Sequence, residues 1–235
     1  MRKTVRDLKR HASNQMNKGD MSVCDWNILY ADSGYDNVGS GPGSLVQNNK
    51  ELIKWLSSFV QKYKIRNILD LGCGDMQWIP SILETLDIDY TGIDGSSNII
   101  NRNKTIYPEF NFIECDIVQK MPTIKNTKVW DISLLKDVIQ HLNDSSLSML
   151  LGNIDTMSIN YKIIIAPGDT RAASLAVLET YGYKLIYKYP SGSYSVLNTS
   201  NNRKAIICND SNTEMKQIFI KTSLLHQFEY ESYKI

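Results

Sequence analysis

Ile68–Trp78 reads ILDLGCGDMQW, an apolar run that ends at two closely spaced glycines and is followed by a helical stretch. This order is typical of a buried parallel strand that turns sharply into a helix and leaves its backbone open to a ligand. A second run, Tyr90–Asp94, ends in a carboxylate about 20 residues after the glycines, where nucleotide-binding α/β folds place the acid that binds a ribose. The spacing therefore predicts an adenosine-type cofactor.

Two residues of the glycine segment indicate which cofactor of this type the site suits. A dinucleotide site requires a third glycine so that a pyrophosphate can lie on the helix N-terminus, but Gln77 occupies that position. Asp75 adds a negative charge that would repel a pyrophosphate. The segment therefore favours a cofactor with a cationic amine or sulfonium group, and a nicotinamide oxidoreductase is a poor alternative.

The bulk composition is that of an ordinary soluble globular protein. The chain has 235 residues, 42% hydrophobic and 22% charged, which is enough for one large domain with a substantial core. A net charge of +1 gives no overall reason to expect nucleic acid or a membrane as partner. The N-terminus is locally basic, which we interpret as a solvated helix face or frayed arm, with an arm that binds an anionic partner as the alternative; its residues are Arg2, Lys3, Arg6, Lys9, Arg10 and His11.

The sequence carries no recognisable targeting signal. No apolar run approaches the roughly 18 residues of a membrane helix, and no apolar signal-peptide region follows the basic N-terminus. The four cysteines are scattered, without Cys-x-x-Cys pairs or histidines at ligand spacing. We therefore expect free thiols in a reducing compartment, the cytoplasm, and neither zinc nor a disulfide framework.

The apolar periodicity alternates between strand and helix, which predicts βαβ units and a sheet covered on both faces. The expected strands are Asn67–Leu71, Tyr90–Asp94, Asn111–Cys115, Val129–Leu135 and Tyr161–Pro167, and the expected helices are Leu45–Tyr63, Trp78–Leu86, Ser97–Tyr107, Ser145–Met157 and Ala172–Tyr181. After these, Tyr183–Tyr189 and Lys204–Asn209 are expected to form an antiparallel hairpin at the end of the sheet.

The predicted domain organisation follows from this pattern. We expect an α/β, Rossmann-like, doubly wound and mostly parallel seven-stranded sheet in residues 45–210, with a terminal antiparallel hairpin. Residues 1–44 are expected to form a helical extension or lid, and the pattern predicts no structure for residues 211–235.

Polar residues follow four successive predicted strands. Since ligands of doubly wound sheets bind outside the carboxyl ends of the strands, these residues are expected to meet in one crevice. They are Asp70, Gly72, Gly74 and Asp75 at the first strand, Asp94 at the second, Asp116 and Ile117 at the third, and Lys136–Leu142 at the fourth.

At these residues the chain resembles the class I S-adenosylmethionine-dependent methyltransferases, over roughly residues 45–210. Asp70–Asp75 matches the first motif of the family, Asp/Glu-x-Gly-x-Gly, and Asp94 falls at the acidic position of the second. Cys115–Ile117 falls at the adenine-contact position, and Lys136–Leu142 is similar to the segment after the fourth strand in many small-molecule members.

A narrower resemblance adds the glycine-rich segment Gly39–Ser44 to these motifs. Together they are similar to a poorly characterised group of bacterial and viral methyltransferases, some of which act in glycan or capsule modification. The resemblance implies S-adenosylmethionine as cofactor, S-adenosylhomocysteine as product, and the cytoplasm of a bacterial or virus-infected host cell. Met76 departs from the family, in which a small residue is common there, and would crowd the methionine end of the cofactor unless its side chain points away.

The resemblance implies a cofactor-binding role for each of several acidic residues, and each residue also has a simpler structural interpretation. Asp94 can accept from both ribose hydroxyls, or it is a turn residue before Gly95. Asp116 can accept from the adenine amino group, or it is a helix N-cap. Asp75 can offset the ammonium charge, or it stabilises the positive end of its helix. The full predicted set is Asp70, Gly72, Gly74, Asp75, Asp94, Asp116, Ile117 and Lys136.

Methyl transfer from a sulfonium is an in-line displacement, so an enzyme must orient the acceptor and remove a proton if that acceptor is a hydroxyl. Of the three histidines, only His141 follows a predicted sheet strand, which makes it the candidate base. Asp137 lies four residues earlier, on the same face if the segment is helical, and would orient the ring. The alternative is a histidine that only packs or caps. We predict no metal, because the pair has no identifiable third ligand.

The N-terminal extension and the late hairpin offer residues for the acceptor. Trp26, Tyr30 and Tyr35 lie near Gly39–Ser44, whose glycines favour a mobile backbone. This region is therefore a candidate lid whose aromatic rings stack on a sugar or base; the alternative is a packed N-terminal extension. Arg171 and Tyr194 are candidates for the acceptor pocket, with Tyr189 and Ser193 beside them.

The sequence as a whole favours an O-methyltransferase that acts on a small molecule or glycan, without nucleic acid or membrane as partner. Methylation of RNA, DNA or protein is the first alternative, although Asp137–Gln140 fills the place where base N-methyltransferases carry Asp/Asn-Pro-Pro-Tyr/Phe. A catalytically inactive subunit that binds the cofactor and scaffolds a partner is the second.

Overall fold

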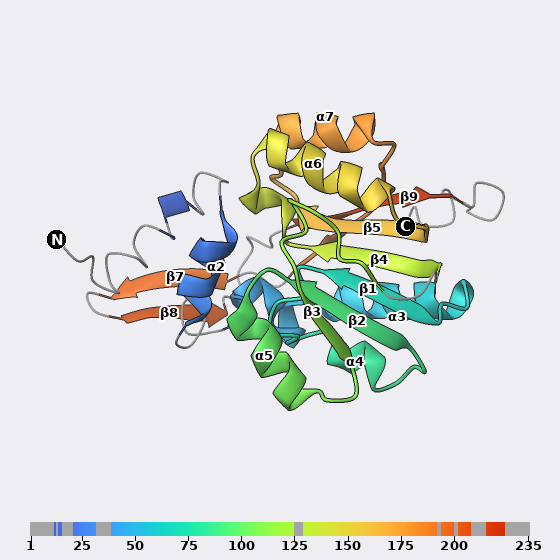
Figure 1. Ribbon diagram of the computed structural model, residues 1–235. Coiled ribbons are helices and arrows are strands. Elements are labelled where there is room, and N and C mark those ends of the chain that lie inside the picture. The colour runs from blue at the N-terminus through green and yellow to red at the C-terminus, as the bar shows by residue number, and fades with distance from the viewer. Residues whose placement is uncertain are drawn as a thin grey trace.

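The structure, a computed structural model, describes residues 12, 14–15, 21–31, 39–124, 129–191, 194–199, 202–207 and 215–223. This part of the chain folds around a seven-stranded sheet in the order β3-β2-β1-β4-β5-β9-β6 (Figure 1). The strands of the sheet are β1 (Asn67–Leu71), β2 (Asp89–Asp94), β3 (Asn111–Glu114), β4 (Trp130–Lys136), β5 (Ile159–Pro167), β6 (Lys184–Pro190) and β9 (Met215–Thr222).

The first five strands are parallel, and β9 runs antiparallel between β5 and β6. The chain winds from β1 outward to β3, then crosses back and continues on the other side of β1 with β4 and β5. The switch point therefore lies between β1 and β4, where folds of this class form a ligand crevice. The predicted Rossmann-like, doubly wound sheet is confirmed.

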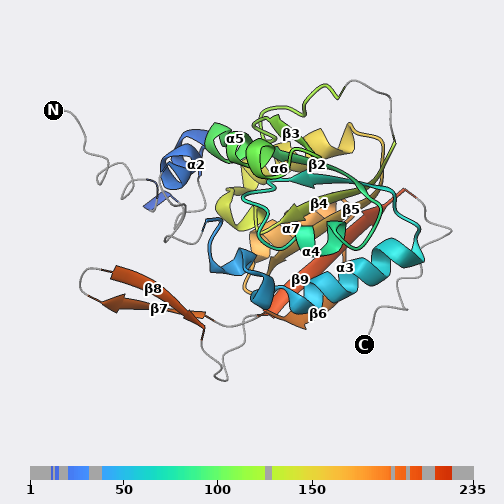
Figure 2. The same cartoon turned by 90° about the horizontal axis from the view of Figure 1, so that it is seen from below.

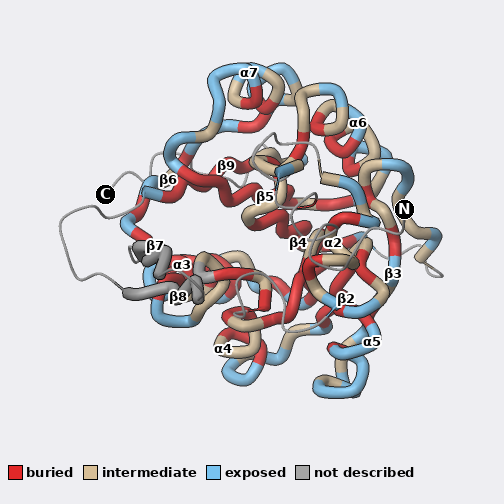
Figure 3. Tube along the Cα trace, turned by 90° about the vertical axis from the view of Figure 1, so that its left-hand side faces the viewer, coloured by how far each residue is buried: buried red, intermediate tan, exposed pale blue. Residues whose placement is uncertain are grey.

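Helices cover both faces of the sheet because each buried strand is apolar on both sides. Ile68 of β1 packs in the cluster beneath α3 (Lys50–Lys62), whereas its neighbour Leu69 packs beneath α6 (Asp144–Asp155). The central strands are buried in Figure 3. The helices α4 (Pro80–Leu83) and α5 (Ser97–Ile106) lie on the same face of the sheet as α3. Figure 2 shows α3 alongside β9 and β6. The helix α7 (Ala172–Thr180) lies on the opposite face, with α6.

The helix α2 (Val23–Tyr30) lies outside the sheet layers, at the carboxyl ends of the strands (Figure 1). A capping box between Ser22 and Asp25 fixes its first turn. The Ser96 hydroxyl donates to Asn27 Oδ1 at 2.8 Å, and the Met21 amide donates to the His141 carbonyl at 3.1 Å. The helix is therefore tied to the ends of both β2 and β4.

Two predicted helices are shorter than expected. The stretch predicted as Leu45–Tyr63 begins with a 3-10 turn at Val46–Asn48, and α3 starts only at Lys50. Another 3-10 turn, Pro42–Ser44, precedes this stretch. The stretch predicted as Trp78–Leu86 is helical only in α4, where Pro80 stands at the first turn. Proline lacks the amide that a preceding turn would need, so it favours a helix start at this point.

The predicted partner of β6 is wrong. Residues 202–207 (β8, Asn202–Ile207) pair with β7 (Tyr194–Thr199) in a separate two-stranded ribbon, and β6 pairs with β9. A strand between two others needs apolar residues on both faces, which Ile218–Ile220 supplies and the charged stretch at Arg203 does not. The sheet thus extends beyond residue 210, into the segment for which the sequence predicted no structure.

Candidate active site

A cavity of about 650 Å³ opens at the carboxyl ends of the central strands, under α2. That volume lies within the range of small-molecule sites, about 300–1,000 Å³. Asp94 lines it from the end of β2, Asp116 and Ile117 from the end of β3, and Asp137 from the end of β4. A second cavity of about 60 Å³ adjoins the glycine turn and is lined by Asp70, Gly72, Gly74, Asp75 and Lys136, among others. The structure therefore brings the predicted cofactor residues together around two cavities.

The glycine turn after β1 allows close contacts on both sides. Gly72 (φ 77°) and Gly74 (φ 55°) have left-handed backbones, and a Cβ at Gly72 would lie 2.6 Å from Val138 Cγ2. Met76 is also left-handed, at φ 57°, and its side chain is 1% exposed within the core cluster beneath α3. The side chain is thus packed in the core, but Met76 also lines the small cavity, as the departure from the family predicted.

Asp94 holds the glycine turn in place. Its Oδ2 accepts from the Gly74 amide at 3.0 Å and its Oδ1 accepts from the Ser96 amide at 2.8 Å. Burial raises the pKa of Asp94, while these backbone donors lower it. The Gly95 amide is a third backbone donor to this carboxylate, so the residue serves its turn and keeps only part of its accepting capacity for a ligand.

Asp116 likewise closes a turn. Its Oδ1 accepts from the Val118 amide at 3.0 Å. Residues 117–119 form a turn and not a helix, so the helix N-cap that was the alternative to adenine binding is wrong. Asp116 also lines the large cavity, beside the buried Ile117. The two roles are compatible, because the second carboxylate oxygen has no hydrogen bond within the described part of the chain.

Asp70 lies buried below the glycine turn and accepts from the Tyr90 hydroxyl at 2.7 Å. Burial raises its pKa to about 7, although the Tyr90 hydrogen bond and the Lys136 charge both lower it. Asp75, further along the turn, accepts from the Gln77 side chain through Oδ2 at 2.8 Å. Its Oδ1 is buried without a hydrogen-bond partner among the described residues. Such an atom is unusual in a native structure and marks a place where a ligand donor fits.

The raised pKa of Asp70 predicts a pH effect on stability. Between its ordinary pKa of 3.8 and about 7, the folded chain keeps the proton that the unfolded chain releases, so stability falls as pH rises through this window. Asp70→Asn removes that titration. The free energy of unfolding of the variant, relative to that of wild type, should therefore rise from pH 5 to pH 7, as measured by urea unfolding. Asp87→Asn, at a fully exposed carboxylate, is the control. A constant difference between Asp70→Asn and wild type across this range would contradict the prediction.

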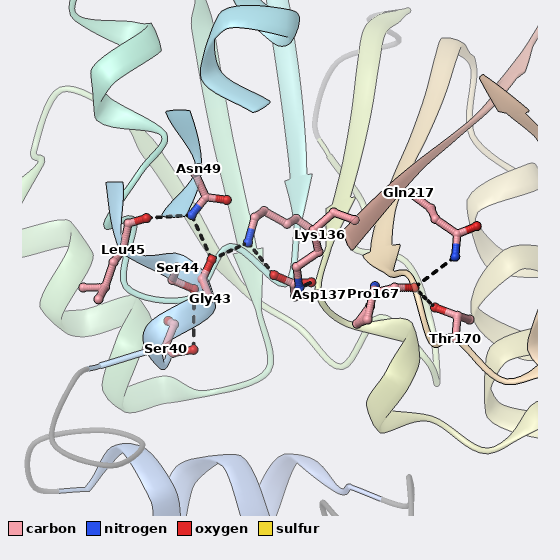
Figure 4. A network of polar contacts seen from close by, with 11 residues as sticks. Ser40, Gly43, Ser44, Leu45, Asn49, Lys136, Asp137, Pro167, Thr170 and Gln217 are labelled. Carbon is pink, nitrogen blue, oxygen red and sulfur yellow. Dashed lines mark hydrogen bonds and ion pairs between the residues drawn. The ribbon is translucent and has the colours of Figure 1, made fainter. Parts of the chain in front are cut away.

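Asp137 is clamped between two lysines at the end of β4. Its Oδ2 pairs with Lys136 Nζ, seen in Figure 4, and its Oδ1 pairs with Lys216 Nζ of β9 at 2.8 Å. Burial alone would raise the pKa of Asp137, but the two ammonium groups hold it well below its usual range. Burial lowers the pKa of Lys136, which the Asp137 charge opposes.

The expected helical pairing of Asp137 with His141 is wrong. Asp137 has a left-handed backbone (φ 54°), and only Ile139–His141 forms a short 3-10 turn. The lysines attract the carboxylate more strongly than the imidazole does, because they bring full charges to a buried group. His141 lines neither cavity: it packs edge-on against Trp26, which does line the large one, at 5.1 Å between ring centroids. Burial lowers the pKa of His141 to about 4, and the Asp137 charge raises it only in part.

Of the residues predicted to bind the acceptor, some line the large cavity and others do not. Trp26 and Tyr30 line the large cavity and stack at 5.9 Å. Arg171 lines neither cavity and donates to the carbonyl of Leu142, a residue that lines the large one, at 2.6 Å. Tyr35 and the basic arm lie outside the described residues, as does the side chain of Tyr194, whose backbone belongs to β7.

The sequence reasoning missed Lys216 altogether, and it placed Ser40 only within the candidate lid segment Gly39–Ser44 without a contact of its own. Lys216 belongs to a strand that the pattern did not predict, so nothing indicated its contact with Asp137. Ser40 contacts the glycine turn directly: its Oγ accepts from the Asp75 amide at 2.9 Å. Its only signal was its place between Gly39 and Gly41, where flanking glycines permit close backbone approach.

No group of three or more His, Cys, Asp or Glu side chains among the described residues is placed to hold a metal ion. Within the same residues, every helix is too short or too polar to cross a membrane.

The fold is similar to solved methyltransferases. ChlM, the magnesium protoporphyrin IX methyltransferase of Synechocystis PCC 6803 solved with bound S-adenosylhomocysteine, matches with a TM-score of 0.54 at 10% identity, over 91% of this chain and 94% of that chain. The methyltransferase domain of bacterial CtHen1 matches with a TM-score of 0.52 at 15% identity, over 74% of this chain and 98% of that chain. A TehB-like S-adenosylmethionine-dependent methyltransferase from Corynebacterium glutamicum ATCC 13032 matches with a TM-score of 0.50 at 16% identity, over 91% and 99%.

These matches establish the fold: the chain has the class I S-adenosylmethionine-dependent methyltransferase fold. No protein-family model matches the sequence, and no curated protein does.

Proposed function

We propose that this protein is an S-adenosylmethionine-dependent methyltransferase that O-methylates a small molecule or glycan in the cytoplasm. The observation that carries the proposal is the large cavity at the switch point of the sheet. Asp94 borders it where this fold binds a ribose, Asp116 and Ile117 border it at the next strand, and the glycine turn adjoins it. A neighbour of the same fold, ChlM, was solved with S-adenosylmethionine and with its product.

The residues present fit this cofactor. The buried Asp75 Oδ1, which has no partner among the described residues, suits the ammonium group of the methionyl part. Asp94 keeps part of its accepting capacity for ribose hydroxyls, and Ile117 offers an apolar surface to the adenine ring. When bound, the cofactor supplies a methyl group on a sulfonium.

The residues of this chain would then orient the acceptor and exclude water. Trp26 and Tyr30 of α2 form an aromatic wall of the large cavity, against which a ring can stack. Among the described residues that line the large cavity, none is a lysine or arginine, whereas Asp25, Asp94 and Asp116 are acidic; the charge of Asp137 is offset by its two lysines. This charge balance favours a neutral or cationic acceptor over a nucleic acid, which needs basic contacts to its phosphates.

His141 is the proposed proton acceptor for an acceptor hydroxyl. With a pKa of about 4 it is neutral near pH 7, but it is a weaker base than a solvated histidine. His141→Gln should therefore lower kcat by about a hundredfold, the lower end for such groups, and leave the cofactor Kd unchanged. Because the imidazole stays neutral from pH 6 to pH 8, it should add no rise of wild-type kcat in this range. An unchanged kcat in the variant would remove His141 from the reaction.

The function is tested by titration calorimetry with S-adenosylmethionine and S-adenosylhomocysteine, followed by a methyl-release assay on a panel of sugars, phenols and RNA. Binding of both, with turnover on a hydroxylated small molecule, is the expected outcome. Binding without turnover on any acceptor would favour the scaffold alternative, and absence of binding would end the proposal.

A further inference from the structure

The glycine-rich strap, Gly39–Ser44, lies directly on the turn that the cofactor would approach. Its Ser40 amide donates to Asp75 Oδ2 at 3.1 Å, and the Asp75 amide donates to Ser40 Oγ at 2.9 Å. The hydroxyl of Tyr30, on α2, donates to the same Ser40 Oγ at 3.1 Å. Ser40 is thus the point where the strap, α2 and the glycine turn meet.

Glycines on both sides make this contact possible. A Cβ at Gly74 would lie 2.3 Å from Ser40 Oγ, and a Cβ at Gly39 would lie 1.6 Å from Asp75 Oδ2. Either substitution would displace the side-chain atom that makes the contact, Ser40 Oγ or Asp75 Oδ2. The bare backbone of Gly74, which the sequence suggested was open to a ligand, is in contact with the strap.

The other end of the strap is anchored separately. The Gly43 carbonyl accepts from Lys136 Nζ at 3.0 Å and from Asn49 Nδ2 at 2.8 Å, as Figure 4 shows. Gly41, between this anchor and Ser40, has a left-handed backbone (φ 92°). A rotation about Gly41 would move the Ser40 end once the long bond from the Ser44 hydroxyl to the Ser40 carbonyl, at 3.5 Å, breaks. The Gly43 end would stay attached to β4 and to Asn49, the N-cap of α3.

The closed strap leaves little space beside the acids of the turn. The small cavity, which Tyr30 and Ser40 line together with Asp70 and Asp75, holds about 60 Å³, against about 650 Å³ for the large one. At about 10–15 Å³ for one water, it has room for four to six waters, fewer than the non-hydrogen atoms of a methionyl group.

We propose that the strap is a latch: Ser40 closes the methionyl half of the cofactor site, and the cofactor enters only when Ser40 releases Asp75. This rests on the proposed function and adds a regulation to it. The apparent affinity then equals the intrinsic affinity multiplied by the fraction of molecules in which the strap is open. Any change that weakens the closed latch should tighten binding.

The test uses S-adenosylhomocysteine, which needs no acceptor. Ser40→Ala removes two of the three latch hydrogen bonds, so its Kd by titration calorimetry should be about fivefold to tenfold lower than that of wild type. Ser58→Ala, which loses one hydrogen bond to Lys54 on the exposed face of α3, is the matched control and should bind as wild type does. An equal or higher Kd in Ser40→Ala would overturn the latch.

A second measurement needs no variant. In wild type, S-adenosylhomocysteine should speed hydrogen exchange at the Ser40 and Asp75 amides, because both latch bonds open on binding. Slower exchange at Ser40 would show that the strap closes over the ligand instead, and would overturn the proposal. If neither wild type nor Ser40→Ala binds the probe, the proposed function itself fails, an outcome distinct from binding with an unchanged latch.

Discussion

Asp137→Ala should lower the free energy of unfolding by about 3–5 kcal/mol, because removal of one partner leaves the others buried and uncompensated. Lys136 and Lys216 are 8% and 4% exposed, and both direct their ammonium groups at this carboxylate. Without it, two like charges remain close together at low dielectric. Urea unfolding at pH 7, with an unchanged m-value, measures the loss.

Asp155 supplies a matched control, since it also lies between two lysines, Lys162 and Lys221, at 2.7 Å and 2.6 Å. Its side chain is 31% exposed, against 17% for Asp137, and the Lys221 side chain is 29% exposed. Solvent screens this cluster, so Asp155→Ala should cost only about 1 kcal/mol. Equal losses in the two variants would show that burial does not control the effect.

A double variant separates the free energy lost with the ion pairs from the cost of leaving buried lysines without a counter-charge. Asp137→Ala with Lys216→Met removes one of the two uncompensated cations, so it should be more stable than Asp137→Ala alone. The effect should vanish only in strong acid. The lysines hold the Asp137 pKa well below its usual range, so the stability it contributes is present above pH 4 and is lost as pH falls through its folded pKa.

The sequence predicted the parallel half of the sheet because that half depends on local signals. Strands such as Asn67–Leu71 are short apolar runs bounded by glycine or polar residues, and their order follows from the alternation with helices. The acids at the strand ends came with them, since the carboxyl ends of parallel strands share an edge.

What the sequence did not predict depends on contacts between distant segments. Ile218–Ile220 is too short a run to distinguish a strand from a helix, and its place between β5 and β6 arises only from pairing on both sides. The contact of Lys216 with Asp137 spans 79 residues, and that of Ser40 with Asp75 spans 35. The pairing of Asp137 with His141 was predicted from helical spacing that the chain does not adopt at this point.

Asp94→Ala should weaken S-adenosylmethionine binding by about 1–3 kcal/mol, or roughly fivefold to 150-fold in Kd, because a charged hydrogen-bond acceptor is lost from a buried site. The residue lines the large cavity and also holds the Gly74 and Ser96 amides. The variant therefore removes a ligand contact and loosens the turn that the ligand meets. Titration calorimetry at fixed pH and salt measures the change.

Two comparisons separate these contributions. Asp94→Asn keeps one oxygen that can accept from the Gly74 amide but loses the charge, so it should bind more weakly than wild type and more tightly than Asp94→Ala. Asp89→Ala, at the exposed start of the same strand and far from the cavity, should leave Kd unchanged. If Asp94→Ala and Asp89→Ala bind S-adenosylmethionine with the same Kd, then Asp94 only stabilises the glycine turn and does not contact the ligand. The acid at the end of β2 would then be a structural residue, and the large cavity would lose the contact that most favours a ribose.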